Sequence, residues 1–340
     1  MIRESIAKLI DRNDLSCAES ESVMNEIMDG AATPAQMAAF LTALRAKGET
    51  VDEITGCARV MREKAIAVKP RRRDLVDTAG TGGDAAGTFN ISTTAAFVIA
   101  GAGLGVAKHG NRAVSGQSGS ADVLEALGVN LDVTPEQVAA CIDEVGIGFL
   151  FAQKLHPAMK NVAPVRKELG IRTVFNILGP LTNPARTPAQ IVGVYDERLT
   201  TTMANVLHAL GVRSAFVFHS DDGLDELTTT GLNRVARFDN GTIYAEEIDA
   251  RAYGMARASR EALRGGKPVE NAQITREVLS GSERGARRDV VILNAAAALV
   301  AGGKARDLHE GLERANDSID SGKARRALDG LIAKSQGFKA

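Results

Sequence analysis

The sequence lacks several features that would assign it to whole classes of protein. Its 340 residues carry 41 basic and 42 acidic side chains, and the formal net charge of -1 gives no overall field that would attract nucleic acid or a membrane surface. It has no run of 18 apolar residues, and its N-terminus has no apolar signal core. We therefore expect neither export nor membrane insertion, and neither a nucleic-acid nor a membrane partner.

Cysteine is scarce. Cys17, Cys57 and Cys141 are odd in number, far apart and outside any C-x-x-C spacing. This pattern indicates neither a disulfide framework nor a zinc site. A reducing, cytoplasmic location fits it best.

Two common nucleotide-binding motifs are also missing. The sequence contains no G-x-x-x-x-G-K-[ST] motif, so a P-loop nucleotidase is unsupported. The glycines of Gly101 to Gly105 imitate a dinucleotide fingerprint, but they end a predicted helix and enter a predicted strand. A Rossmann turn has the opposite order, and NAD binding is therefore disfavoured.

The chain does have the length and the 44% hydrophobic content for a large buried core with a smaller domain attached. Its first 65 or so residues show only the spacing of amphipathic helices. Capping boxes at Thr33 to Gln36 and at Thr50 to Glu53 each precede a stripe of apolar residues. These residues predict a small helical bundle.

From Asp74 the pattern changes to short apolar runs that alternate with helices, which is typical of a mostly parallel sheet. The predicted strands are Asp74 to Asp77, Gly105 to Ala107, Gly146 to Phe151, Gln190 to Val194 and Ser214 to Phe218. The predicted helices are Ser92 to Ala100, Ala121 to Leu127, Pro135 to Glu144 and Glu197 to Leu210, followed by amphipathic helices from Arg287 onward. Asn240-Gly241 indicates a hairpin. The predicted fold class is α/β, with a small helical N-terminal domain and a large domain whose central sheet is flanked by helices.

The most informative motif is the glycine-rich segment from Asp77 to Asp84, which follows a strand and precedes the helix start at Asn90 to Thr94. Glycines allow backbone N–H groups to approach an anion closely, and a helix N-terminus adds further donors. This segment predicts a phosphate or diphosphate cradle. The alternative is an ordinary glycine-rich turn.

A second loop, Lys108 to Arg112 followed by Ser115 to Ser120, contains two cations, amides and hydroxyls. Parallel topology places it beside the first loop, at the carboxyl edge of the sheet. It predicts a second anion-binding surface. A solvated basic loop with a serine cap is the alternative.

Carboxylates follow the strand Ser214 to Phe218, at Asp221, Asp222, Asp225 and Glu226. Opposite a diphosphate, such carboxylates act through Mg²⁺, because bare carboxylates would repel the ligand. A metal bridge is therefore implied, with an acidic surface turn as the alternative.

Arg166 and His156 stand in a helical segment interrupted by proline. Arg166 has the planar group that pairs with a carboxylate, yet most helix arginines lie on the surface. The residues alone leave both roles open.

At these positions the chain resembles the anthranilate phosphoribosyltransferases, a family with the nucleoside phosphorylase-like phosphoribosyltransferase fold, along nearly its whole length. The matching blocks are G-T-G-G-D at 80–84, N-I-S-T at 90–93, K-H-G-N-R at 108–112, S-G-S-A-D-V-L-E-A-L-G at 118–128, and H-P-A-M-K through V-R-K-E-L-G-I-R-T-V-F-N-I-L-G-P-L-T-N-P at 156–184. Together these blocks are highly specific.

The resemblance implies transfer of the phosphoribosyl group from phosphoribosyl diphosphate to anthranilate in tryptophan biosynthesis, with Mg²⁺, two ions per subunit, as cofactor. It also implies a homodimer formed through helical domains. The helical domain would span residues 1–66, completed by about 166–186, and the large domain residues 72–165 and 187–340.

The resemblance also implies roles for individual residues. Those implied at the phosphoribosyl diphosphate site are Gly80, Gly83, Asp84, Thr88, Asn90, Ile91, Ser92, Thr93, Lys108, His109, Gly110, Asn111, Arg112, Ala113, Val114, Ser115, Gly116 and Ser120. Those implied to face anthranilate are Gly80, Asn111 and Arg166, with His109, His156 and Pro180 as neighbours. Ser92, Asp225 and Glu226 are implied Mg²⁺ contacts.

Two departures affect the second loop, because Ala113 and Gly116 stand where the family commonly has serines. A third, at Gly231 to Asn233, touches no predicted site residue. The aromatic amine of anthranilate is neutral at pH 7, so we expect no dedicated general base.

Three other functions compete with this one. A pyrimidine nucleoside phosphorylase of the related fold would not need Asp225 and Glu226 for a metal. A type I phosphoribosyltransferase has its acidic pair nearer to a threonine-glycine loop than Asp221-Asp222 is to Thr229 to Gly231. A non-catalytic nucleic-acid-binding relative should show a basic excess, which the net charge of -1 does not.

Overall fold

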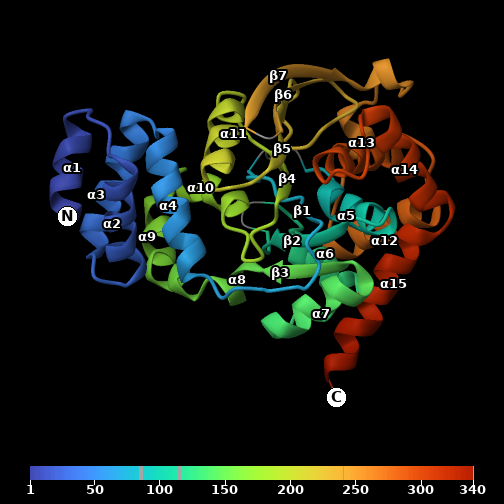
Figure 1. Cartoon of the computed structure of the whole chain (residues 1–340), viewed down its shortest axis with the longest axis horizontal. Helices are drawn as coiled ribbons and strands as arrows, with labels where there is room; N and C mark the ends of the chain where they lie inside the picture. The colour runs from blue at the N-terminus through green and yellow to red at the C-terminus, as the bar shows by residue number, and fades with distance from the viewer. Residues whose placement is uncertain (84–86, 114–115, 240, 340) are drawn as a thin grey trace.

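The computed structural model describes residues 1–83, 87–113, 116–239 and 241–339. Its first part is a group of helices, drawn in blue at the left of Figure 1. They are α1 (Ile2–Ile10), α2 (Cys17–Met28), α3 (Pro34–Lys47) and α4 (Val51–Lys64). The predicted capping boxes are present, because Thr33 and Thr50 accept hydrogen bonds from the backbone N–H groups of Gln36 and Glu53.

The second part is built on a sheet with the strand order β3-β2-β1-β4-β5-β6-β7. The strands are β1 (Leu75–Asp77), β2 (Gly105–Gly110), β3 (Ile147–Phe151), β4 (Ala189–Gly193), β5 (Ser214–Ser220), β6 (Leu232–Asp239) and β7 (Thr242–Asp249). β1 to β5 pair in parallel, whereas β5–β6 and β6–β7 are antiparallel. The mostly parallel sheet is therefore confirmed, and so is the pairing of the predicted hairpin, whose Asn240 lies outside the described residues.

Helices connect the strands in the order expected. They are α5 (Ile91–Gly101), α6 (Ser120–Leu127), α7 (Pro135–Val145) and α11 (Leu199–Ala209). α5 ends at Gly101 and β2 begins at Gly105, so the imitation of a dinucleotide fingerprint has the reversed order that the sequence predicted.

A crossing segment between β3 and β4 lies against the helical group. It consists of α8 (Ala152–Leu155), the 3-10 turn Pro157–Asn161, α9 (Ala163–Leu169), α10 (Phe175–Leu178) and the 3-10 turn Gly179–Leu181. α9 contacts α3, and α10 contacts α4, as their neighbouring positions in Figure 1 also show. The chain thus leaves the sheet, joins the helical group and returns.

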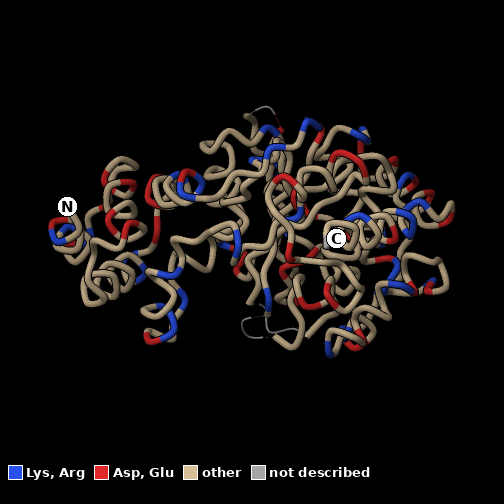
Figure 2. The backbone as a smooth tube through the Cα atoms, turned by 90° about the horizontal axis from the view of Figure 1, so that it is seen from below, with Lys and Arg blue, Asp and Glu red and all other residues tan. Residues whose placement is uncertain are grey.

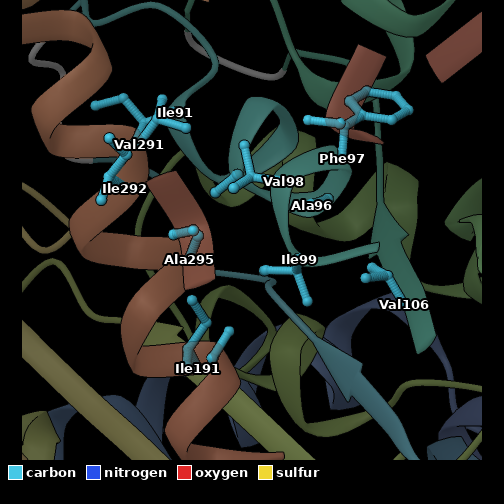
Figure 3. Packing of buried hydrophobic residues seen from close by; sticks show 14 of the residues in the cluster. Ile91, Ala96, Phe97, Val98, Ile99, Val106, Ile191, Val291, Ile292 and Ala295 are labelled. Atoms are coloured by element: carbon cyan, nitrogen blue, oxygen red, sulfur yellow. The ribbon is translucent and has the colours of Figure 1, made fainter. Parts of the chain in front are cut away.

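The C-terminal third forms α12 (Pro268–Ser280), α13 (Ala286–Ala301), α14 (Leu308–Asp320) and α15 (Lys323–Gln336). All four contact α5, and α13 also packs on β4 and β5. α13 is not the amphipathic helix that we expected, because every residue from Val290 to Ala301 is buried. Figure 3 shows the reason: α5, with Val98 and Ile99, packs between α13 and β2. A helix enclosed by other elements has no polar face.

A second hydrophobic cluster joins the helical group to the other face of the sheet. It includes Val60 and Met61 of α4, Leu207 of α11, Val217 of β5 and Phe238 of β6. α11 therefore packs on α4 and on the sheet at once.

Basic and acidic residues are interspersed along both parts of the chain, as Figure 2 shows. Among the described residues, no helix combines the length and apolar character needed to cross a membrane.

The carboxyl ends of β1, β2, β4 and β5 meet at one edge of the sheet, because these strands run in parallel. The predicted phosphate loops and acidic pair follow β1, β2 and β5. The fold therefore brings them to the same edge, where ligands of open α/β sheets bind.

Candidate active site

The first loop of the site follows β1 and is shaped by its glycines. Gly82 and Gly83 have φ angles of +67° and +81°, in the left-handed region that favours glycine. Gly80 has no room for a side chain, because a Cβ there would lie 2.8 Å from Asp225 Oδ2. Gly80 therefore lies directly against the acidic pair. Asp84 falls outside the described residues.

The start of α5 contributes backbone more than side chains. Ile91 and Thr93 are buried, so only their backbone groups could meet a ligand. The backbone N–H of Ser92 donates to Glu226 Oε1 at 3.1 Å. The N–H groups of a helix N-terminus attract anions, and here a carboxylate accepts one of them.

Asn90 joins three segments of the site. Its Nδ2 donates to Ser118 O at 3.0 Å, and its Oδ1 accepts from Ser118 Oγ at 3.1 Å and from Asn271 Nδ2 at 2.9 Å. Thr88, just before it, forms an isolated antiparallel bridge with Arg264. Asn90 thus holds the start of α5 to the second loop and to α12.

Lys108, at the end of β2, is a buried cation that links the two loops. Its Nζ donates to Thr78 O at 2.9 Å and to Thr78 Oγ1 at 3.0 Å, and it lies 3.4 Å from Ser92 Oγ. Burial lowers the pKa of Lys108, while the negative charges of Asp77, Glu226 and Asp225 oppose that effect. A cation is therefore fixed where both anion-binding segments begin.

The second loop leaves β2 and returns at α6. A Cβ on Gly110 would lie 2.2 Å from Ser120 Oγ, so the two ends of the loop pack closely. Asn111 O accepts from Ser120 Oγ at 3.2 Å. Val114 and Ser115 fall outside the described residues.

The guanidinium of Arg112 is directed at α6, where it pairs with Asp122 and Glu125. Ala113 takes part through its backbone N–H, which donates to Asp122 Oδ2 at 2.9 Å. Gly116 has open space where a Cβ would stand. The two departures from the family's serines therefore leave these bonds intact.

The acidic pair follows β5 and reaches both anion-binding segments. Asp225 Oδ2 accepts from Gly82 N–H at 2.6 Å, and Glu226 contacts Ser92 as described above. Asp222 supports this turn through bonds with Ser220 Oγ and Thr230 Oγ1. The structure thus brings the three residues predicted at the metal, from positions 92, 225 and 226, into one place.

His109 and His156 form a buried pair beside the crossing segment. Their Nε2 atoms lie 3.2 Å apart, and His109 Nδ1 lies 3.1 Å from Gly179 O. Because a carbonyl can only accept, His109 Nδ1 carries the proton and its Nε2 accepts from His156. Burial lowers their pKa values to about 3 and about 4, so both rings are neutral at pH 7. Pro180, whose carbonyl accepts from Gln190 Nε2, follows directly.

Arg166 lies on α9 with its guanidinium 5.3 Å from the ring centre of Phe175. It is partly buried, and burial lowers its pKa. Among the described residues it has no hydrogen-bond or ion-pair partner for its side chain. An arginine held over an aromatic face with its donors unused is suited to a planar anion.

Sequence reasoning included Asp77 and Asn183 in its motifs but assigned neither of them a role at the site. The buried carboxyl of Asp77 accepts from His109 N–H at 3.0 Å and from Asn183 Nδ2 at 2.8 Å, and burial raises its pKa to about 6. Asn183 Nδ2 also donates to Ala107 O at 2.8 Å. These bonds fix the end of β2 and the returning crossing segment. The only signal was an aspartate at the end of a buried strand.

Arg172 was missed as well. Its guanidinium lies 4.1 Å from the ring centre of Tyr195 and donates to Gly83 O at 2.6 Å. It therefore ties the crossing segment to the glycine-rich loop. An exposed arginine between two predicted elements gave no sign of this contact.

Comparisons with known proteins show which family the chain resembles. Residues 3–65 match the model of the glycosyl transferase family helical bundle domain, and residues 72–325 match that of the a/b domain. The chain is 58% identical over 324 residues to anthranilate phosphoribosyltransferase from Symbiobacterium thermophilum, with 95% of each chain covered. It is 57% identical over 337 residues to that of Chloroflexus aggregans, with 99% of each covered.

Solved structures show the same likeness. The enzyme from Thermus thermophilus has a TM-score of 0.93 at 45% identity, with 98% of this chain and 99% of that chain covered. The enzyme from Saccharomyces cerevisiae, in complex with phosphoribosyl diphosphate and Mg, has a TM-score of 0.89 at 29% identity, with 99% of this chain and 98% of that chain covered. With its two glycosyl transferase domains in order and its phosphate loops and acidic pair at one sheet edge, the chain belongs to the anthranilate phosphoribosyltransferase family.

Proposed function

We propose that the chain transfers the 5-phosphoribosyl group of phosphoribosyl diphosphate to the amine of anthranilate and releases diphosphate. The observation that carries this proposal is the convergence of Gly82, Ser92, Lys108 and the acidic pair at one edge of the sheet. Backbone N–H groups and a buried ammonium are the donors that a diphosphate requires. The yeast relative was solved with this donor substrate and with 4-fluoroanthranilate.

The donor substrate would lie between the two loops. We assign its contacts to Gly80, Gly83, Asp84, Thr88, Asn90 to Thr93, Lys108 to Gly116 and Ser120. The buried side chains of Ile91 and Thr93 limit these two residues to backbone contacts. For Arg112 we limit the contact to the backbone, because its guanidinium pairs with Asp122 and Glu125.

The site fits Mg²⁺. Among the described residues no group of three or more His, Cys, Asp and Glu side chains is placed to hold a metal. Mg²⁺, however, is commonly held by one or two carboxylates together with water and substrate phosphates. Asp225 and Glu226 supply the carboxylates beside the predicted diphosphate position, and Ser92 adds a hydroxyl. When bound, Mg²⁺ would neutralise charge on the departing diphosphate. We propose two ions per subunit.

The acceptor would bind on the side of the crossing segment. Arg166 is partly desolvated and lacks a protein partner among the described residues, so we assign it to the carboxylate of anthranilate. Gly80 and Asn111 would face the same substrate, with His109, His156 and Pro180 beside it. A neutral, buried imidazole pair suits an uncharged aromatic ring.

Catalysis then depends on placing the amine of anthranilate next to C1, and not on removing a proton from the amine before it attacks. The lone pair of the neutral amine attacks C1, the bond between C1 and the diphosphate oxygen breaks, and the nitrogen afterwards loses a proton to water. N–H groups of the first loop and the Lys108 ammonium stabilise the departing anion. His109 and His156 hold no positive charge at pH 7, so they leave the developing oxocarbenium ion unopposed.

The test is the loss of anthranilate fluorescence when phosphoribosyl diphosphate and Mg²⁺ are added to the purified protein. We expect stoichiometric consumption of both substrates, which chelation of the metal abolishes. Failure to consume anthranilate, together with phosphorolysis of thymidine or uridine, would instead identify a nucleoside phosphorylase.

We further propose a cytoplasmic homodimer whose subunits meet through the helical domains, residues 1–66 completed by about 166–186, with the large domain spanning 72–165 and 187–340. Ile10 of α1 is 68% exposed and would be covered in such an interface. The three cysteines are free thiols, which suits a reducing compartment. Light scattering on a size-exclusion column tests the dimer, and Ile10→Glu should weaken it.

A further inference from the structure

The second anion loop is braced from behind by α6. Arg112 Nη1 donates to Asp122 Oδ1 at 3.0 Å and to Glu125 Oε2 at 2.5 Å, and Nη2 donates to Glu125 Oε1 at 2.8 Å. The two bonds to Glu125 form the paired fork that arginine makes with carboxylates. The guanidinium also lies 5.5 Å from the ring centre of Phe151 in β3.

Asp122 binds both sides of the loop. Asp122 Oδ2 accepts from Ala113 N–H at 2.9 Å and from Gly119 N–H at 2.9 Å, while its Oδ1 takes Arg112. The ends are in backbone contact, because a Cβ on Gly119 would lie 2.3 Å from Ala113 N. One side chain therefore holds Ala113, beyond the end of β2, next to Gly119, where α6 begins.

The positive charge of Arg112 is paired with the carboxylates of Asp122 and Glu125. The two carboxylates raise the pKa of the guanidinium, and Glu125 contributes more to this shift than Asp122. The pKa values of both carboxyl groups are lowered. A diphosphate that sought Arg112 would have to compete with a bidentate partner already in place. The cationic contribution at this edge comes instead from Lys108, which is directed to Thr78 and Ser92.

We propose that Arg112, Asp122 and Glu125 are positioning residues: together they hold the second anion loop in the shape that binds phosphoribosyl diphosphate, and Arg112 acts through Glu125 rather than on the substrate. This inference rests on the proposed function for the identity of the donor substrate. These ion pairs are partly exposed, so they should contribute little to folding stability, and their loss should act on the shape of the loop.

A double-mutant cycle distinguishes a brace from a direct contact. Arg112→Ala, Glu125→Ala and the double variant should each raise the KM for phosphoribosyl diphosphate by a similar factor, about 10- to 100-fold, because a small displacement of a binding loop is costly. The KM for anthranilate should change little. Arg112→Lys keeps the charge but loses the fork, and should be as impaired as Arg112→Ala.

A direct contact predicts the opposite pattern. Arg112→Ala would weaken the donor substrate, Glu125→Ala would leave it unchanged or strengthen it by removing a negative charge, the effects would add, and Arg112→Lys would restore binding. Any of these results would overturn the proposal. Arg306→Ala is the matched control, because Arg306 also pairs with a glutamate, Glu310, but on a remote helix.

Two measurements do not depend on turnover. Hydrogen exchange at the Gly119 amide should accelerate in Asp122→Asn and Arg112→Ala while the melting temperature stays close to that of the wild type; unchanged exchange would contradict the brace. Calorimetry with Mg²⁺ and phosphoribosyl diphosphate should give the same order of affinities as the KM values. If the wild-type protein binds this substrate but ignores anthranilate, the proposed function fails while the brace is still tested.

Discussion

Asp225 Oδ2 lies 2.6 Å from the backbone N–H of Gly82, and Glu226 lies similarly against the N–H of Ser92. These N–H groups belong to the two segments that are predicted to bind diphosphate. A diphosphate that uses them must displace the carboxylates, and a cation that binds the carboxylates makes the exchange easier. The acidic pair therefore opposes anion binding without Mg²⁺ and supports it with Mg²⁺.

The double variant Asp225→Asn with Glu226→Gln tests this relationship. With a chelator present, it should bind inorganic diphosphate about tenfold more tightly than the wild type, as expected from removing competing charged hydrogen bonds. With substrates present, it should need much more Mg²⁺ and lose most turnover. Calorimetry and Mg²⁺ titrations of the rate measure both effects.

Asp221→Asn is the control, because Asp221 lies in the same turn but pairs with Arg234. If the double variant matches the wild type in Mg²⁺ dependence and in diphosphate affinity, the acidic pair is a surface turn and holds no metal.

Arg166→Ala should weaken anthranilate by about 1.5 to 3 kcal/mol, the usual contribution of a charged hydrogen bond, or roughly 10- to 100-fold in KM. The KM for phosphoribosyl diphosphate should stay nearly constant, since Arg166 lies on the crossing segment and not on either loop. Steady-state kinetics with each substrate varied in turn give the comparison. Lys167→Ala, an exposed neighbour on α9, serves as control. Equal losses for both substrates would refute the assignment.

Gly193, at the end of β4, has no room for a side chain. A Cβ there would lie 1.6 Å from the backbone oxygen of Asp225, so alanine must push the acidic loop away from the glycine-rich loop. We expect kcat/KM to fall by about a hundredfold, with a stability loss of about 1 to 3 kcal/mol. Gly337→Ala, where nothing lies within 4 Å of the added Cβ, should have no effect. Near-normal activity of Gly193→Ala would mean that the acidic loop can move without consequence.

Stability should depend on pH through the buried groups beside β2. The pKa values of His109 and His156 are lowered in the folded protein. As pH falls below about 6.5, both histidines therefore bind protons in the unfolded chain but not in the folded protein, and the free energy of unfolding decreases. The raised pKa of Asp77 acts in the opposite sense. In the folded protein Asp77 binds a proton below about pH 6, which the unfolded chain does not bind until lower pH. This binding adds to the free energy of unfolding at low pH, and the addition is lost as pH rises through about 6.

Between pH 6 and pH 4.5 the net difference is therefore one proton, and the free energy of unfolding should fall by about 1.4 kcal/mol per pH unit. Asp77→Asn removes the opposing group and should steepen the slope to about 2.7 kcal/mol per pH unit. Urea unfolding at several pH values measures both slopes. A slope that Asp77→Asn leaves unchanged would contradict the raised pKa.

Local signals in the sequence predicted much of the fold. The capping boxes at Thr33 and Thr50 begin helices as predicted, since a cap needs only residues three positions apart. The helix Pro268–Ser280 was not predicted, and the buried α13 was expected to be amphipathic. An enclosed helix has no alternating faces, so its sequence reveals little about its surroundings.

The placement of the segments around the candidate site also followed from the sequence. Parallel topology sufficed to bring the loops and the acidic pair together, because strand ends share an edge. The hydrogen-bond partners of the individual side chains did not follow from any local pattern. That Arg112 turns to Glu125, and that Asp77 meets Asn183 across 106 positions, depends on packing between distant segments. The proposed roles of the individual site residues remain predictions for the experiments above.

The cluster that runs from Met61 in α4 through Leu207 in α11 to Val217 in the sheet has a consequence for dissecting the chain. Residues 3–65 match a helical bundle model, but cutting there would expose the face of α4 that packs on α11. A fragment ending at residue 65 should therefore aggregate or stay unfolded, and the intact chain should melt in a single cooperative transition. A chimaera that joins this helical bundle to the a/b domain of a relative should fold only if it also contains α11 of this chain, which covers α4.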